Sequence, residues 1–198
     1  MLTCEEWERQ LVRKTTKHTQ KLDTNLLNDL GVDLSTGRLF LTGEVCEAMY
    51  VRTLTGLAAL NQAARTKRLT VCLNTLGGDV YQAFAIYDLI RLNHVPVDIH
   101  VNGPCLSAGV IILQSAQGRA ATSNSYLMVH EGSESIDGES LTVHKTVEHF
   151  KGVNNRARKI IADRVKVSEE RVQKWFERDK YFNAKAALKA GLIDMVLE

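Results

Sequence analysis

The sequence predicts an α/β domain in which at least part of the sheet is parallel. Three observations support this fold class. From Arg38 onward, short apolar and β-branched runs alternate with longer helical stretches, and glycine-containing turns separate the two kinds of segment. Strands that alternate with helices in this way form parallel sheets. With 198 residues, of which 44% are hydrophobic and 24% charged, the chain is long enough for one domain with one core.

The segments before Gly103 follow a strand–helix order. Residues up to about Leu30 are polar and are expected to be helical. The expected strands are 38–42, 69–73 and 97–101, and the expected helices are 45–64 and 79–92. The first helix is rich in Ala and Leu. The second carries apolar side chains on one helical stripe: Val80, Phe84, Tyr87 and Ile90.

The second half of the chain continues the alternation. Residues 102–104 are expected to form a turn, 107–117 a buried apolar helix, 126–129 a strand and 139–165 a long polar helix. Ser168 is a helix N-cap signal, because its hydroxyl can accept from free amides and carboxylates follow in the first turn. Asn183 caps a last helix that Gly191 ends, and 192–197 is the final strand.

Composition and charge exclude several functional classes. The net charge of +2 comes from interspersed charges, so nucleic acid is not an expected partner. The longest apolar run, 110–113, is too short to cross a bilayer, and the acidic N-terminus lacks the apolar core of a signal sequence. No C-x-x-C pair occurs among Cys4, Cys46, Cys72 and Cys105. The sequence therefore predicts neither a disulfide framework nor a membrane-spanning segment. A cytoplasmic location is expected.

Two strand-to-helix turns are candidates for catalytic chemistry. One is residues 76–79 (Leu-Gly-Gly-Asp), and the other, 103–109, contains Ser107. A serine at such a turn holds its hydroxyl beside the free amides of a helix N-terminus, and acyl transfer needs a nucleophile next to such an oxyanion site. Each turn alone is equally consistent with an ordinary turn or helix cap. The two together are more informative.

His130 and Asp179 are candidate partners of Ser107. His130 follows the expected strand 126–129, and Asp179 lies in a charged stretch between two expected helices. Each also has an ordinary structural interpretation, and spacing does not bring the three residues together, because a triad is recognised by geometry. No metal is expected, since no metal-ligand spacing occurs among the other histidines: His18, His94, His100, His144 and His149.

Several short motifs, in unbroken order, resemble the Clp protease proteolytic subunit. They are 39–45 (LFLTGEV), 73–80 (LNTLGGDV), 85–88 (AIYD), 103–109 (GPCLSAG), 127–130 (LMVH), 177–184 (ERDKYFNA) and 190–194 (AGLID). On these motifs the chain is identified as a divergent member of this ClpP-type serine peptidase family. The resemblance implies a peptidase domain at 38–198, after an unusual N-terminal segment, 1–37. It also implies a ClpP/crotonase-like spiral of β-β-α units with a protruding long handle helix.

The resemblance implies a role for each matched site residue. Ser107 would attack the peptide carbonyl, and His130 would take its proton and pass it to the leaving amine. Asp179 would orient the imidazole and stabilise its charged form. The backbone amides of Gly78 and Ala108 would form the oxyanion hole. Neither a cofactor nor a metal is implied.

The resemblance further implies a self-compartmentalised assembly. The chain would be a homo-oligomer of heptameric rings, stacked as a tetradecamer, that hydrolyses unfolded polypeptides delivered by an AAA+ unfoldase. Segment 139–165 would join the rings, and its apolar residues suit an interface as well as a solvated helix: Leu141, Val147, Phe150 and Val153. Segment 1–37 does not resemble the family's apolar axial loop, so the unfoldase is a weaker expectation than the peptidase chemistry.

The substrate groove departs from the family pattern, and other functions remain open. Leu76 stands where the family usually has Pro, Leu106 where it has a smaller residue, and Glu131-Gly132 where it has Gln-Pro. The alternatives are a non-catalytic ring subunit, an acyl-coenzyme A enzyme of the same spiral fold, and a signal-peptide peptidase with a lysine base. The presence of Ser107, His130 and Asp179 favours the Clp-type peptidase over all three.

Overall fold

The computed structural model describes residues 27, 29, 31–63, 66–133 and 140–198 of the chain. Its strands are β1 (Val32–Asp33), β2 (Arg38–Thr42), β3 (Leu69–Thr75), β4 (Val97–Leu106), β5 (Arg119–Thr122), β6 (Tyr126–Val129), β7 (Lys180–Asn183) and β8 (Met195–Leu197). Its helices are α2 (Glu47–Ala63), α3 (Val80–Arg91), α4 (Ala108–Leu113), α5 (Ser140–Ala162), α6 (Glu169–Phe176) and α7 (Ala184–Ala190). The expected helix before Leu30 lies almost wholly outside these residues.

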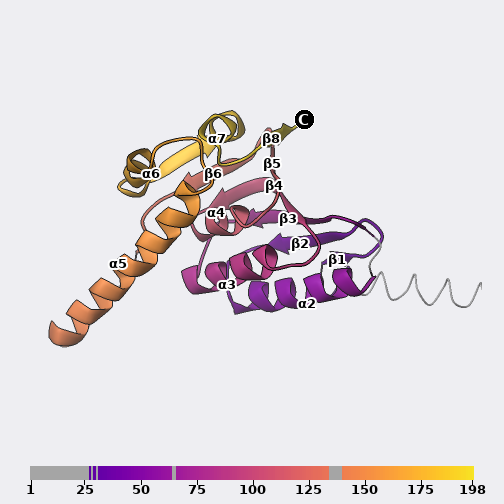
Figure 1. Cartoon of the computed structure of the whole chain (residues 1–198), viewed down its shortest axis with the longest axis horizontal. Helices are drawn as coiled ribbons and strands as arrows, with labels where there is room; N and C mark the ends of the chain where they lie inside the picture. Colours follow the sequence, from indigo (N-terminus) through magenta and orange to yellow (C-terminus); the bar gives the residue numbers. More distant parts are fainter. Residues whose placement is uncertain (1–26, 28, 30, 64–65, 134–139) are drawn as a thin grey trace, which may run out of the picture.

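The strands form one mostly parallel sheet. Its order is β1-β2-β3-β4-β5-β8, and β6 leaves this path to pair with β4 and β7. The pairings β2–β3, β3–β4, β4–β5, β4–β6 and β5–β8 are parallel, whereas β1–β2 and β6–β7 are antiparallel. In Figure 1, α2 and α3 lie side by side below the sheet, and α5 extends away from the body as a long rod. The predicted α/β class and protruding helix are confirmed.

The predicted helix caps are confirmed in atomic detail. Ser168 accepts a hydrogen bond from the Arg171 amide at 3.3 Å, and Asn183 accepts one from the Ala186 amide at 2.9 Å. Gly191 adopts a left-handed conformation with φ +81° and ends α7. These polar side chains satisfy amides that have no partner within the helix, so each helix begins where the sequence places it.

Several sequence-based boundaries are wrong, among them the expected final strand 192–197, which is only β8. The expected turn at 102–104 lies inside β4, because the strand continues past β5 and pairs Pro104–Leu106 with Tyr126–Met128 of β6. The Ser125 hydroxyl accepts a hydrogen bond from the Gly103 amide at 3.1 Å, at the point where β4 passes from pairing with β5 to pairing with β6. The expected helix 107–117 is only α4, since Ser107 itself is not helical. Three short strands, β1, β5 and β7, were not predicted.

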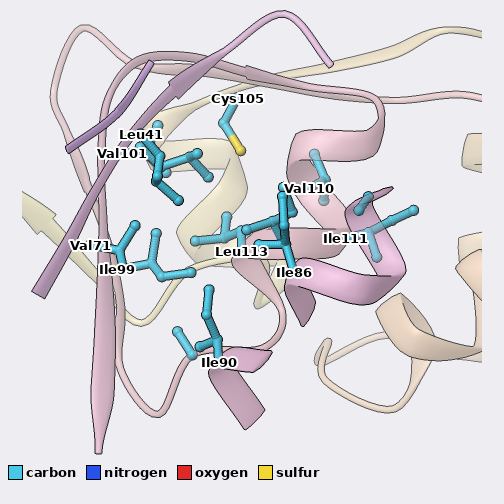
Figure 2. Close-up of a cluster of buried hydrophobic side chains, with 14 of the residues drawn as sticks. Leu41, Val71, Ile86, Ile90, Ile99, Val101, Cys105, Val110, Ile111 and Leu113 are labelled. Carbon is cyan, nitrogen blue, oxygen red and sulfur yellow. The ribbon is translucent and has the colours of Figure 1, made fainter. Parts of the chain in front are cut away.

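The hydrophobic core lies between the sheet and helices α3 and α4. Strand β3 alternates buried and half-buried residues, so Leu69, Val71 and Leu73 face inward. All six residues of α4 are buried, and Figure 2 shows Val110, Ile111 and Leu113 beside Ile86 of α3. Because all six residues of α4 are buried, packing fixes the position of the turn that precedes it.

An ion pair fixes the chain beside β5 and β8. Arg119 is 5% exposed, and its Nε and Nη2 donate to the Asp194 carboxylate at 3.0 and 2.6 Å. Burial alone would raise the pKa of Asp194, but the hydrogen bonds and positive charge of Arg119 outweigh it and lower that pKa. A buried guanidinium that loses such a partner is left uncompensated, so the pair is expected to matter for stability.

We expect Asp194→Asn to lower the free energy of unfolding at pH 7 by about 1–2 kcal/mol, a value reduced because water screens the half-exposed carboxylate. A lowered folded-state pKa stabilises the fold above the unfolded value of about 3.9 and ceases to do so as pH falls through the folded value. The difference in the free energy of unfolding between wild type and variant, measured with urea, should therefore become smaller as the pH is lowered from 7 to 3. Asp163→Asn is the control, because the one ion pair it breaks among the described residues is the exposed pair with Lys159. A difference that is equal at both pH values would contradict the prediction.

Candidate active site

Ser107 occupies a strained corner between β4 and α4. Its backbone has φ +53° and ψ −122°, and among the described residues it alone combines a positive φ with a side chain. Such a conformation costs about 1–3 kcal/mol and persists only where the surroundings impose it. Here β4 precedes it, α4 is buried behind it, and its amide donates to the Met128 carbonyl at 2.8 Å. The strain is therefore concentrated at the predicted nucleophile.

The glycine loop after β3 packs directly against this corner. A Cβ on Gly77 would lie 2.8 Å from both the Leu106 carbonyl and the Ser107 Cβ, and one on Gly109 would overlap the Thr75 methyl group. Gly77 also has φ +100°, which disfavours any other residue. The two glycine-containing turns that the sequence predicts separately thus form a single site.

His130 meets Ser107 because β6 lies beside β4. The parallel register pairs Leu106 with Met128, which places the ends of both strands at the same edge of the sheet. The Ser107 Oγ lies 2.7 Å from the His130 Nε2, a hydrogen-bond distance. A nucleophile and base within this distance are the geometric signature of nucleophilic catalysis.

Asp179 reaches His130 through β7, a strand that the sequence does not predict. The antiparallel register pairs Val129, the last residue of β6, with Lys180, the first residue of β7. His130, which follows β6, therefore faces Asp179, which precedes β7. The His130 Nδ1 lies 3.6 Å from the Asp179 Oδ1, slightly longer than a hydrogen bond, and the Asp179 side chain is 63% exposed. A carboxylate on this side favours the tautomer that keeps a proton on Nδ1 and points the free Nε2 lone pair at Ser107.

Gly78 and Ala108, the two predicted oxyanion-hole residues, line the same pocket as Ser107. Val45 and Gly78 form an isolated parallel β-bridge. In this bridge the Val45 amide donates to the Gly77 carbonyl and the Asp79 amide donates to the Val45 carbonyl, both at 2.8 Å. The Gly78 amide takes part in neither hydrogen bond. Ala108 is the first residue of α4, where an amide has no partner within the helix. An oxyanion hole formed by the Gly78 and Ala108 amides stays a prediction.

A pocket of about 540 Å³ opens beside these groups. Its wall is mainly apolar and includes Ile111, Val129, Phe150, Ala157, Ile161 and Phe176. Of the positions expected in the substrate groove, Gly132 lines this pocket, whereas Leu76, Leu106 and Glu131 are not among its lining residues. The wall formed by α5 was not predicted, and Phe150 was considered only as an interface residue. The available signal was the spacing on α5, since residues 150, 154, 157 and 161 share one helical face. That face lines the site.

In the part of the chain that the structure describes, no group of three or more His, Cys, Asp or Glu could hold a metal ion. None of the described helices is both long and apolar enough to span a membrane. Cys46, Cys72 and Cys105 are free thiols, and burial strongly raises the pKa of Cys105. A buried thiol of this kind is inert although it lies two residues from Ser107.

The chain is similar to known proteins of one family. The family model described as Clp protease matches residues 8–198. The chain is 28% identical to ATP-dependent Clp protease proteolytic subunit 2 of Treponema denticola over 165 residues, which is 82% of either protein. It is 30% identical to proteolytic subunit 3 of Rhodococcus jostii over 187 residues, covering 89% of this chain and 92% of the relative.

The fold has a similarly clear relative among solved structures. A mutant of ClpP1 from Listeria monocytogenes superimposes with a TM-score of 0.77 at 21% identity, covering 87% of this chain and 96% of that one. The family match begins at residue 8, inside the segment expected to diverge. The division at residue 38 therefore stays a prediction. On the extent of the family match and the identity to its relatives, the chain belongs to the Clp protease family of serine peptidases.

Proposed function

We propose that Ser107, His130 and Asp179 are the catalytic triad with which this Clp-type serine protease hydrolyses peptide bonds. The observation that carries the assignment is the 2.7 Å contact between the Ser107 Oγ and the His130 Nε2. It occurs at the strained Ser107 backbone and beside two amides that can receive an oxyanion. A structural serine at a helix start requires none of these features.

The geometry supports a two-step acyl transfer. The Ser107 Oγ attacks the scissile carbonyl carbon while the His130 Nε2 takes its proton, and the Gly78 and Ala108 amides donate to the developing oxyanion. His130 then gives the proton to the leaving amine as the C–N bond breaks, and an acyl-enzyme forms. A water molecule, deprotonated by the same imidazole, then attacks the ester carbon. The bond to the Ser107 Oγ breaks, His130 returns the proton to that oxygen, and the acid is released. Asp179 stabilises the imidazolium in both steps.

Family membership supports a proposal for the assembly and the substrate. The two curated relatives are named as proteolytic subunits of an ATP-dependent protease. We infer that this chain likewise forms heptameric rings, stacked as a tetradecamer in the cytoplasm, and cleaves unfolded polypeptides supplied by an AAA+ unfoldase. The projection of α5 away from the body supports a role in joining subunits (Figure 1).

Labelling with a fluorophosphonate serine probe tests the proposal. The assembled wild type should label stoichiometrically, and both Ser107→Ala and His130→Ala should abolish labelling, because the probe requires a serine activated by its base. Peptide mapping should place the adduct on Ser107. Labelling that survives Ser107→Ala would overturn the nucleophile assignment. An assembled wild type that does not label would instead identify the chain as a non-catalytic ring subunit.

A further inference from the structure

The segment that follows His130 is held by helices on both sides. The Glu131 amide donates to the Phe176 carbonyl at the end of α6, at 3.1 Å. The Gly132 amide donates to the Asn154 Oδ1 of α5 at 3.2 Å. The Asn154 Nδ2 in turn donates to the Glu131 Oε1 at 3.4 Å. One amide side chain therefore binds two successive residues, immediately after the proposed catalytic base.

Gly132 allows this close approach. A Cβ at this position would lie 3.2 Å from the Phe150 ring and 3.3 Å from the Asn154 Oδ1, so these two side chains would have to move by a few tenths of an ångström to admit it. Gly132 also supplies an amide N–H, which a proline in its place would lack. The backbone of segment 131–132 thus lies directly on the helix.

The contacts of Asn154 also determine what the pocket presents to a substrate. Asn154 lines the pocket together with Phe150, Ala157 and Ile161 of the same helix. Its amide is the polar group on this helical face, yet both ends of it are hydrogen-bonded to segment 131–132. The face therefore offers a substrate mainly apolar surface, although an asparagine stands in its middle.

We propose that Asn154 is a positioning residue that couples α5 to the base: it fixes residues 131–132 and thereby holds the His130 imidazole against Ser107. This inference rests on the proposed catalytic role of His130. Because Asn154 acts through His130, its loss should slow the chemical step more than it weakens substrate binding. A displacement of a reacting group by a fraction of an ångström is enough to lower the rate.

Exchanging the donor and the acceptor tests this coupling. In Asn154→Asp, one carboxylate oxygen still accepts from the Gly132 amide, but the other faces the Glu131 carboxylate and repels it. Combining this change with Glu131→Gln restores a hydrogen bond in the opposite direction, because the new amide can donate to the new carboxylate. Glu131→Gln alone keeps an acceptor for the Asn154 Nδ2. Asn155→Asp is the matched control, since Asn155 is exposed on the same helix and bonds only Arg158 among the described residues.

We expect Asn154→Asp to lower kcat for a fluorogenic peptide roughly tenfold, the equivalent of one hydrogen bond to a charged group, with KM changed less than about twofold. Fluorophosphonate labelling of Ser107 should slow by a similar factor, and hydrogen exchange in residues 129–133 should increase. The double variant, Asn154→Asp with Glu131→Gln, should recover most of the lost kcat and most of the lost protection from hydrogen exchange. Glu131→Gln, which keeps an acceptor for the Asn154 Nδ2, should lose less kcat than Asn154→Asp, and Asn155→Asp should behave as wild type. Equal melting temperatures and assembly sizes show that every variant folds.

Two results would overturn the inference. One is an Asn154→Asp variant with the kcat, labelling rate and exchange of Asn155→Asp. The other is a loss of kcat that Glu131→Gln does not reverse in the double variant, because this would assign Asn154 to packing alone. Failure of the proposed function is distinguishable from both results, since it would appear in the wild type as an absence of labelling at Ser107.

Discussion

Ser107→Ala, His130→Ala and the double variant should each lower kcat for peptide hydrolysis by about the same factor, roughly 10⁴–10⁶. The reason is the 2.7 Å contact between the two side chains, through which we propose that they act as a single functional unit. Without the base, the serine hydroxyl is a poor nucleophile. Without the hydroxyl, the base has no proton to take. The residual rate would come from the oxyanion donors and substrate binding.

Single-turnover and steady-state assays on the three variants check this prediction. Ser133→Ala is the matched control, because Ser133 also lines the pocket but is not part of the proposed triad. It should change kcat by less than about threefold, as expected for a residue outside the reacting unit. A double variant whose loss equals the product of the two single losses would contradict the prediction, since it would show that the residues act independently.

The backbone at Ser107 adds a stability test to the same variants. Ser107→Ala keeps a Cβ at φ +53°, whereas Ser107→Gly removes it. Relief of this strain should make the glycine variant more stable than the alanine variant, by an amount within the roughly 1–3 kcal/mol that such backbone strain costs, less the conformational entropy of glycine. The catalytic position would thus be held at a cost in stability.

The local parts of the site could be predicted from the sequence. Glycines 77 and 78 after a short apolar strand, and Ser107 before a wholly apolar stretch, specify two strand-to-helix turns. The caps at Ser168 and Asn183 were predictable for the same reason. In all these cases a polar side chain or a glycine meets a backbone requirement only a few residues away, so short-range patterns contain the information.

The contact between the base and Asp179 could not be predicted in this way. It depends on β7, which has a single buried residue, Phe182, packed edge-on against Trp175 with ring centroids 4.9 Å apart. A four-residue strand with exposed flanking side chains shows no clear alternation. Its register with β6 is a long-range property, and that register alone places Asp179 opposite His130. The family resemblance supplied what local patterns could not.

The α5 wall of the pocket was not predicted, because the apolar pattern of this helix has two interpretations. Phe150 and Val153 of α5 suggest an apolar face, and the sequence alone does not say whether that face meets another subunit or the same chain. In the structure Val153 is buried, and Phe150 lines the space beside Ser107. The angle at which α5 leaves the body decides between the two, and no local sequence feature determines that angle.

Asp179→Asn should lower kcat by roughly 10²–10⁴, the upper value being that of a triad in which the carboxylate is fully engaged. The amide can donate to the His130 Nδ1, which favours the tautomer that carries its proton on Nε2 and has no lone pair for Ser107. The 3.6 Å separation and 63% exposure of Asp179 place the expected loss below that of Ser107→Ala. Water already solvates part of this carboxylate, so less stabilisation is lost.

Glu177→Gln separates the carboxylate's position from its charge. It removes the same charge two residues earlier, where the side chain is exposed, and should leave kcat within about twofold of wild type, as for an exposed surface charge. The kcat of all three proteins should be measured with the same fluorogenic peptide at pH 7. Equal losses in Asp179→Asn and Glu177→Gln would reduce Asp179 to a contributor of net charge. If instead only Asp179→Asn loses activity, the unpredicted strand β7 positions a catalytic residue, because its register with β6 is what brings Asp179 to His130.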